Sequence, residues 1–341
     1  MGFFIRKRKN HFPVDGRTVV ITGGSQGMGR GLAKLLAKKG SNVVIVARDV
    51  KKLQAAIEYI SAAAANPQTQ RFHYISADLT NPSESVRVIE EVTAWNNGQP
   101  PDIVWANAGT ARPGLFVEIP IETLRAQMDA NYWTATYLAH ATLNCWLKPA
   151  SAFPATEGPA PTLPRHFVIT SSSLAFCGIA GYSAYSPAKA ALRSLSDSLR
   201  SELNLYAGAR RAKYGSAATA PPADIKIHSV YPGTILSPGH AAEEQSKHPV
   251  TKVLEEGDPA QTEDQVAAVA VRELEKGGYL ISTQFLGSAM RASALQGSPR
   301  NNWFVDTVFS WATSIAWLFI GPDMEGKVYK WGKENGMTNA Q

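Results

Sequence analysis

The chain has 341 residues, of which 44% are hydrophobic, so it can bury a large core, and we expect one enlarged α/β domain with a tail. Its two cysteines are too few for a disulfide framework, and its seven histidines show no metal-ligand spacing, so we expect no metal site. The net charge of +6 comes without a cluster of basic and aromatic residues, which argues against a nucleic-acid partner. The positive charge could instead serve an anionic cofactor or an anionic membrane surface, or it could be solvated surface charge.

Residues 1–14 are expected to form a basic N-terminal tail. The apolar residues 3–5 precede four cations at 6–9, and the stretch lacks the apolar core of a secretory signal. Gly2 does not predict myristoylation, because Arg6 stands where that signal needs Ser or Thr. The tail is either a tether to a membrane surface or a frayed end.

A strand over residues 19–22 leads into a glycine-rich turn, and a helix over 32–40 follows. Glycines allow tight backbone angles and let a phosphate oxygen approach the main chain. The start of the helix offers unpaired N–H groups to that phosphate. Because the turn lies between a strand and a helix, it is a candidate dinucleotide-binding turn.

The second strand, residues 42–47, is followed by Arg48 and Lys52 rather than by the acidic residue that commonly binds the ribose of NAD. A cation at this place favours the 2′-phosphate of NADP; the alternative is solvated charge at the start of the helix expected over 50–65. A third strand, residues 72–77, ends at Asp78. Asp78 could bond the adenine amino group; the alternative is a helix-capping Asp or Asn at this point, and Asn81 could also start the next helix.

Further strands are expected over 102–106 and 167–170, and a long helix over 121–147 lies between them. Asn131 within that helix is either a satisfied core amide or a functional group. We expect exposed insertions at 148–165, which is rich in proline, and at 207–223. Strands that alternate with helices in this way predict a doubly wound parallel sheet.

The candidate catalytic residues lie around the start of a helix that runs from Tyr185 to about residue 206. Tyr185 and Lys189 share one helix face, and Pro187 fits only the first turn, which places Tyr185 at the mouth of the helix. A nearby ammonium favours the phenolate, so it should lower the pKa of Tyr185 from about 10 toward the range of a general acid. One serine of residues 171–173 would hold the substrate oxygen; we favour Ser172, and strand register decides between the three.

Together these motifs resemble the short-chain dehydrogenase/reductase family over roughly residues 15–285. The resemblance rests on Thr22-Gly23-x-x-x-Gly27-x-Gly29, Asn107-Ala108-Gly109, Asn131, Ser172 and Tyr185-x-x-x-Lys189. It implies a Rossmann fold with a nicotinamide cofactor across the carboxyl edge of the sheet. It also implies that Tyr185 gives a proton to a carbonyl whose oxygen Ser172 orients. Lys189 would bind the ribose, and Asn131 would hold a water that relays protons to Lys189.

A more specific resemblance, over nearly the whole chain, is to the fungal 3-ketodihydrosphingosine reductases. It is carried by residues 23–27, 231–240, 297–302 and 330–333. It implies reduction of a long-chain sphingoid ketone with NADPH. The catalytic and cofactor-binding residues implied are Gly23, Ser25, Gln26, Gly27, Gly29, Arg48, Lys52, Asp78, Leu79, Asn107, Asn131, Ser172, Tyr185 and Lys189.

The same resemblance leaves alternatives for the activity. The chain could reduce another apolar ketone, such as a steroid or a 3-ketoacyl lipid, or it could be an inactive NADP-binding membrane scaffold. Residues 236–262 could form a mobile lid, and Glu243 or Glu244 within it could meet the ammonium group of a sphingoid substrate.

Residues 303–320 are apolar except for a polar stripe at helical spacing, formed by Asp306, Thr307, Ser310, Thr313 and Ser314. The opposite face would carry Phe309, Ala312, Ile315, Ala316 and Phe319. The segment could just span a hydrocarbon layer of roughly 30 Å, but the stripe favours a helix that lies in the membrane plane. The alternative is a helix packed on the enzyme's own core or on a second subunit.

These observations predict an NADP-binding reductase domain over 15–290 and a membrane-associating helical tail over 291–341. We expect the protein at the endoplasmic reticulum membrane, with its catalytic domain facing the cytosol. The family resemblance also implies a homo-oligomer.

Overall fold

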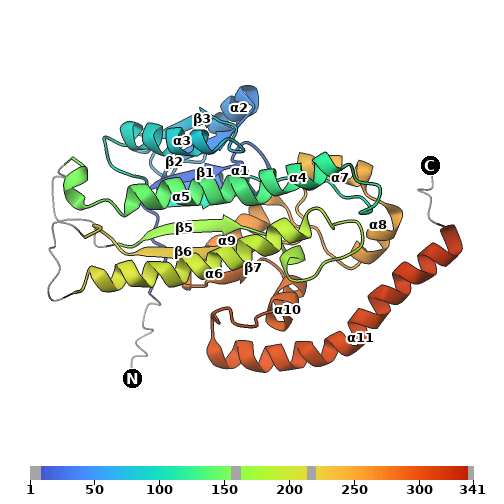
Figure 1. Cartoon of the computed structure of the whole chain (residues 1–341). Coiled ribbons are helices and arrows are strands. Elements are labelled where there is room, and N and C mark those ends of the chain that lie inside the picture. Colours follow the sequence, from blue (N-terminus) through green and yellow to red (C-terminus); the bar gives the residue numbers. More distant parts are fainter. Residues whose placement is uncertain (1–8, 155–162, 213–219, 337–341) are drawn as a thin grey trace, which may run out of the picture.

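Seven parallel strands form one sheet in the order β3-β2-β1-β4-β5-β6-β7, with helices on both faces (Figure 1). The computed structural model describes residues 9–154, 163–212 and 220–336. The expected tether at the N-terminus and the middle of each expected insertion lie outside the described residues. The doubly wound parallel sheet predicted from the sequence is confirmed.

The elements have the following bounds. The strands are β1 Thr18–Thr22, β2 Asn42–Ala47, β3 Phe72–Ser76, β4 Ile103–Ala106, β5 Arg165–Thr170, β6 Ile225–Tyr231 and β7 Leu280–Ser282. The α-helices are α1 Gly27–Lys38, α2 Val50–Ser61, α3 Pro82–Trp95, α4 Ile121–Met128, α5 Thr134–Trp146, α6 Ser186–Ala209, α7 Pro238–Ser246, α8 Pro249–Glu255, α9 Glu263–Glu275, α10 Phe285–Ser293 and α11 Trp303–Asn335. The π-helical turn η1 is Asp129–Trp133, and the 3-10 turns are η2 Ala150–Ala152 and η3 Ser173–Ala175.

Side chains along each strand alternate between the two faces of the sheet, because successive Cβ atoms of a strand point to opposite sides. Val19 and Ile21 of β1 belong to the core cluster that includes α1 and α9. Val20 belongs to the cluster that includes α3, α5 and α6. The strand order reverses between β1 and β4, which opens a crevice for a ligand at the carboxyl ends of the strands.

Several boundaries differ from the sequence expectation. Helix α1 begins at Gly27, inside the glycine turn, and α2 ends at Ser61, before the alanine run. The long helix expected over 121–147 is present, but a π-helical turn around Asn131 interrupts it. We assigned no element to β6, β7 or α9, and β7 has only three residues, too few to show an alternating pattern.

Phe12 and Val14 lie in the stretch expected to be a tail, yet both are buried in the core. The ring of Phe12 makes an edge contact with the buried Trp105 of β4, with 6.4 Å between ring centroids. The last residues before β1 therefore anchor the chain to the sheet.

Helix α11 runs past α10 to α8 and ends at Asn335 (Figure 1). Asp306, near its start, is buried and pairs with Arg291 of α10 at 2.7 Å. Two residues of the polar stripe, Asp306 and Thr313, are therefore buried against the domain. At these two positions the helix packs on the enzyme's own core, which was the alternative to a helix in the membrane plane.

The outer face of α11 is apolar and exposed. Ile315, Leu318 and Phe319 are 62%, 69% and 73% exposed, whereas Phe309 and Ala316, expected on the same face, are half-buried against the domain. Of the helices in the described residues, α11 alone has the length and composition of a membrane span, with a mean hydropathy of 1.4 over its most apolar window.

Candidate active site

The glycine turn between β1 and α1 forms one end of the candidate site. Gly23 and Gly27 have φ angles of 65° and 56°, in the left-handed region that favours glycine. A Cβ at Gly29 would collide with the carbonyl oxygen of Gly23, so only glycine lets the helix begin this close to the turn. Gln26 is the N-cap of α1, and its side chain makes no capping hydrogen bond. The first N–H groups of α1 therefore face an anion-binding position.

Hydrogen bonds join the carboxyl ends of the three central strands beside this turn. Thr22 accepts from the backbone N–H groups of Asn107 and Ala108 at 2.9 and 3.0 Å. The Asn107 side chain in turn accepts from the Thr170 hydroxyl at 3.1 Å. Thr22 belongs to a sequence motif, but no local pattern predicts its role or that of Thr170, because these bonds connect residues far apart in the chain.

Arg48 and Lys52 follow β2 and are exposed at the rim of the same crevice. Within the described part of the chain, no ion pair involves either cation, so both are available to an anion. Asp49 caps α2 by accepting from the Lys52 N–H at 3.0 Å. Asp78 accepts from the Thr80 backbone and hydroxyl, while Asn81 caps α3; Asp78 is therefore not the helix cap that we considered as its alternative role.

The three candidate serines after β5 have different environments. The Ser171 hydroxyl donates to the Lys189 carbonyl at 2.8 Å, so it fixes α6 to the sheet. Ser173 begins the turn η3 and is buried. The Ser172 hydroxyl accepts from the Leu174 N–H at 3.2 Å. It also lies near enough to the Tyr185 hydroxyl to oppose the rise in the pKa of Tyr185. Ser172 is therefore the serine beside the tyrosine.

Tyr185 is the N-cap of α6, with Pro187 in the first turn, as the sequence predicted. The Lys189 Nζ lies 5.5 Å from the centroid of the Tyr185 ring and donates to the Thr170 carbonyl at 3.3 Å. Burial raises the pKa of Tyr185 and lowers that of Lys189 to about 8. The pKa of Tyr185 thus moves opposite to the direction we expected, because desolvation of the phenolate is the largest effect here.

Asn131 is fully buried in the π-helical turn beside Lys189. Its side-chain amide donates to the carbonyls of Thr110 and Gln127 at 2.8 and 2.9 Å. A Cβ at Gly109 would lie 2.7 Å from the Asn131 oxygen and 3.2 Å from the Lys189 Nζ, so only glycine lets these two groups approach the same point. Single π-helical turns are frequent at functional sites.

A cavity of about 1080 Å³ joins most of the predicted site residues. Those that line it are Gly23, Ser25, Gln26, Gly27, Arg48, Lys52, Asp78, Leu79, Asn107, Ser172, Tyr185 and Lys189. Gly29 and Asn131 lie behind its surface. The rest of the lining includes residues of α7, α8, α10 and α11. Helices α7 and α8 lie within residues 236–262, the segment considered as a lid.

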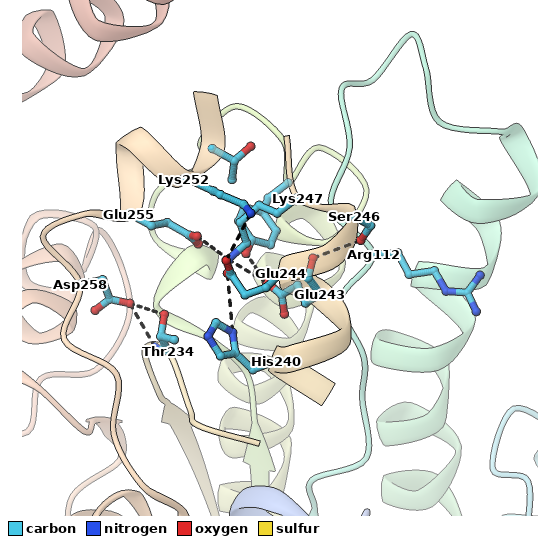
Figure 2. Close-up of polar contacts among 12 residues, drawn as sticks. Arg112, Thr234, His240, Glu243, Glu244, Ser246, Lys247, Lys252, Glu255 and Asp258 are labelled. Atoms are coloured by element: carbon cyan, nitrogen blue, oxygen red, sulfur yellow. Dashed lines mark hydrogen bonds and ion pairs between the residues drawn. The ribbon is translucent and has the colours of Figure 1, made fainter. Parts of the chain in front are cut away.

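A cluster of charged side chains lies where α7 and α8 meet, and Figure 2 shows them converging. The side chain of Lys247 is only 2% exposed and contacts Glu243, Glu244 and Glu255. Glu244 is held further by Lys252 at 3.8 Å and by His240 at 4.0 Å. Glu244 is therefore committed to cations of the protein itself.

Glu243 differs from Glu244 because it lines the cavity. The Tyr182 hydroxyl donates to its carboxylate, and the Tyr182 ring lies 5.9 Å from the Tyr185 ring. Glu243 also contributes to the raised pKa of Tyr185, so its negative charge acts on the tyrosine hydroxyl. No sequence pattern predicts a role for Tyr182, because its hydrogen bond to α7 depends on tertiary structure.

Comparisons with known proteins agree with this geometry. The family model for short chain dehydrogenase matches residues 17–248. A 3-ketodihydrosphingosine reductase of Aspergillus fumigatus, ksrA, is 53% identical over 98% of this chain and 89% of its own length. A second, gsl-3 of Neurospora crassa, is 42% identical over 98% of this chain and 87% of its own length.

Solved structures show the same fold at low sequence identity. The short-chain dehydrogenase from Sphingobium yanoikuyae in complex with NADPH has a TM-score of 0.62 and 22% identity, and it covers 83% of this chain and 93% of that one. The L-sorbose reductase from Gluconobacter frateurii, complexed with NADPH and L-sorbose, has a TM-score of 0.61 and 21% identity, and it covers 81% of this chain and 98% of that one.

Proposed function

The chain belongs to the short-chain dehydrogenase family, and we propose that it reduces 3-ketodihydrosphingosine to dihydrosphingosine with NADPH. The observation that carries the proposal is a single cavity in which Ser172, Tyr185 and Lys189 face a wall formed by α10 and α11. A ketone at the tyrosine can therefore be joined to a long apolar chain in the same cavity. The fungal relatives described above support the same substrate.

The cofactor side of the cavity fits a phosphorylated dinucleotide. The glycine turn and the start of α1 would hold its pyrophosphate, and Ser25, Gln26 and Asn107 lie beside that position. Arg48 and Lys52 would bind the 2′-phosphate, since guanidinium and ammonium groups form strong hydrogen bonds to phosphate. Asp78 would accept from the adenine amino group, with Leu79 next to it.

The chemical step needs a hydride, which bound NADPH supplies to C3 of the ketone, and a proton for the carbonyl oxygen. Ser172 orients that oxygen by a hydrogen bond. Tyr185 donates the proton, and its raised pKa keeps the phenol protonated until the carbonyl oxygen gains negative charge. Lys189, with a pKa lowered to about 8, can replace the proton of Tyr185 near neutral pH. The Asn131 region would supply the water that links Lys189 to solvent.

The membrane is the place where such a substrate is found. We propose that α11 lies in the membrane plane, because it packs on α8 and α10 while its outer face is apolar and exposed. Lys327, Lys330 and Lys333 near its end would meet anionic head groups. The proposed location is the endoplasmic reticulum membrane with the active site on the cytosolic side. A homo-oligomer through the helices over 121–147 and 185–206 stays a prediction.

The proposal is tested by product analysis. The purified protein in detergent is given NADPH with 3-ketodihydrosphingosine, a steroid ketone or a 3-ketoacyl lipid, and products are identified by mass spectrometry. Formation of dihydrosphingosine, with little reduction of the other ketones, is the expected result. Reduction of the steroid alone would support the assignment of the catalytic residues but contradict the proposed substrate.

A further inference from the structure

One wall of the cavity is apolar and contains none of the proposed catalytic or cofactor-binding residues. It consists of two helices that follow the sheet, α10 and α11. The side chains that line it are Leu286, Met290, Ala316, Trp317, Ile320 and Met324. This wall and Tyr185 line the same cavity.

Contacts at both ends of α11 hold its inner face against the cavity. Near its start, Asp306 pairs with Arg291 of α10, and these side chains are only 6% and 9% exposed. Near its end, the Trp331 ring contacts the His248 ring, just before α8, with 4.8 Å between centroids. The segment between these anchors lines the cavity. Its position is therefore fixed by tertiary contacts, although much of the helix is exposed.

The size of the cavity is compatible with a ligand larger than a small ketone. Its volume of about 1080 Å³ exceeds the range of about 300–1,000 Å³ typical of small-molecule pockets. Along α11, the polar residues that line the cavity are Thr313, Asp323 and Lys327. Between Thr313 and Asp323, the lining residues of α11 are Ala316, Trp317 and Ile320, and with those of α10 they form an apolar stretch.

We propose that the wall formed by α10 and α11 binds the aliphatic chain of the substrate. This proposal rests on the proposed function in one respect: the aliphatic chain must be part of the ketone that is reduced at Tyr185. The ketone lies at Tyr185, and the chain runs along Ala316 and Ile320 toward Met324. Each methylene buried against this wall strengthens binding by about fourfold, so the wall selects long chains.

Two alanines one turn apart on α11 provide the matched test. Ala316 lines the cavity, whereas Ala312 is exposed on the outer face. Phenylalanine at Ala316 fills the space for the chain, and phenylalanine at Ala312 adds the same group outside it. Ala289→Phe repeats the block from α10, because Ala289 lines the same cavity. Thermal melting identifies any variant that fails to fold.

The kinetic readout compares 3-ketodihydrosphingosine with a hexyl-tailed analogue that keeps its ammonium and ketone. We expect Ala316→Phe or Ala289→Phe to lower kcat/KM for the long-chain ketone by about tenfold or more, since two or three methylenes lose their contacts. The hexyl analogue and the Ala312→Phe variant should change little. Equal loss for both substrates, or no loss for the long one, would overturn the proposal.

A binding readout separates this inference from the proposed activity. Trp317 lines the cavity, so a sphingoid base with a brominated chain should quench tryptophan fluorescence in the wild-type protein and much less in Trp317→Phe. Quenching without any ketone reduction would refute the proposed function and keep the chain site. Ketone reduction together with quenching that does not depend on Trp317 would support the proposed function but refute the binding site for the aliphatic chain.

Discussion

Burial has opposite effects on the two ionisable residues at the centre of the cavity. It raises the pKa of Tyr185 and lowers the pKa of Lys189 to about 8. Both shifts favour the neutral form of the side chain, because charge is costly in a site from which water is excluded. A neutral tyrosine holds the proton that a carbonyl reduction consumes. The residues are thus prepared for reduction before a substrate enters.

Glu243 is the carboxylate that a sphingoid ammonium beside the ketone would meet. Replacing it by Gln keeps an acceptor for the Tyr182 hydroxyl but removes the negative charge. We expect Glu243→Gln to raise KM for 3-ketodihydrosphingosine by about tenfold, the worth of a charge-assisted hydrogen bond. A ketone of the same chain length without the amine should be little affected.

Glu244→Gln is the matched control, because Glu244 faces Lys247 and Lys252 rather than the cavity. Steady-state kinetics on the two variants with both ketones measures the effect. Equal KM values for wild type and Glu243→Gln would remove Glu243 from substrate binding.

Arg48 is predicted to select the 2′-phosphate of the cofactor. Arg48→Ala should raise KM for NADPH by about tenfold and leave KM for NADH nearly unchanged, because only NADPH carries the phosphate. Lys51→Ala is the control, since Lys51 is an exposed neighbour that does not line the cavity. A parallel loss with both cofactors would mean that Arg48 supports the fold instead.

At the scale of elements, features formed by residues close together in the sequence could be predicted, and contacts between distant elements could not. The glycine turn with its strand and helix, and the pair Tyr185 and Lys189, are local patterns, so spacing alone identified them. The bond between Tyr182 and Glu243 and the pair between Arg291 and Asp306 join different elements. Asp306 looked like part of a solvent-facing stripe, because its partner could not be known before the fold.

The pair between Arg291 and Asp306 is predicted to attach the start of α11. Asp306 also accepts from the backbone of Asn301 at 2.8 Å. Asp306→Asn leaves Arg291 buried without its counter-ion, which typically costs about 3 kcal/mol or more. We expect faster hydrogen exchange at the start of α11, while the sheet stays protected.

Asp323→Asn on the same helix provides the comparison. Asp323 pairs with Lys327 at 2.8 Å, but both side chains are at least half exposed, and such pairs contribute about 1 kcal/mol or less. Its exchange rates should match those of wild type. Unchanged protection of α11 in Asp306→Asn would show that apolar packing alone attaches the helix.

At the scale of the whole molecule, α11 separates two apolar environments. Its inner face borders the cavity, and its outer face is exposed over Trp311, Ile315 and Leu318. A patch of this kind on a soluble surface marks an interaction site, and the net charge of +6 suits an anionic bilayer. The geometry fits an enzyme whose substrate chain enters from the lipid side.

Membrane attachment through this face is tested with two leucines of similar exposure. Leu318 on α11 is 69% exposed, and Leu205 on α6 is 73% exposed. Leu318→Glu should reduce flotation with anionic vesicles by about tenfold or more, because a charge replaces an apolar contact worth about 2 kcal/mol. Leu205→Glu should float like wild type. Equal flotation of both variants would place the membrane contact elsewhere.

The most direct test of the account follows the hydride itself. The purified protein is incubated with 3-ketodihydrosphingosine and NADPH in which both hydrogens at C4 of the nicotinamide are deuterium, and the product is analysed by mass spectrometry. We predict dihydrosphingosine with deuterium at C3, and a loss of about 10²-fold or more in its rate of formation with Tyr185→Phe, which keeps the ring but has no proton to give. Unlabelled product, or an undiminished rate without the Tyr185 hydroxyl, would contradict the proposed reaction at this site.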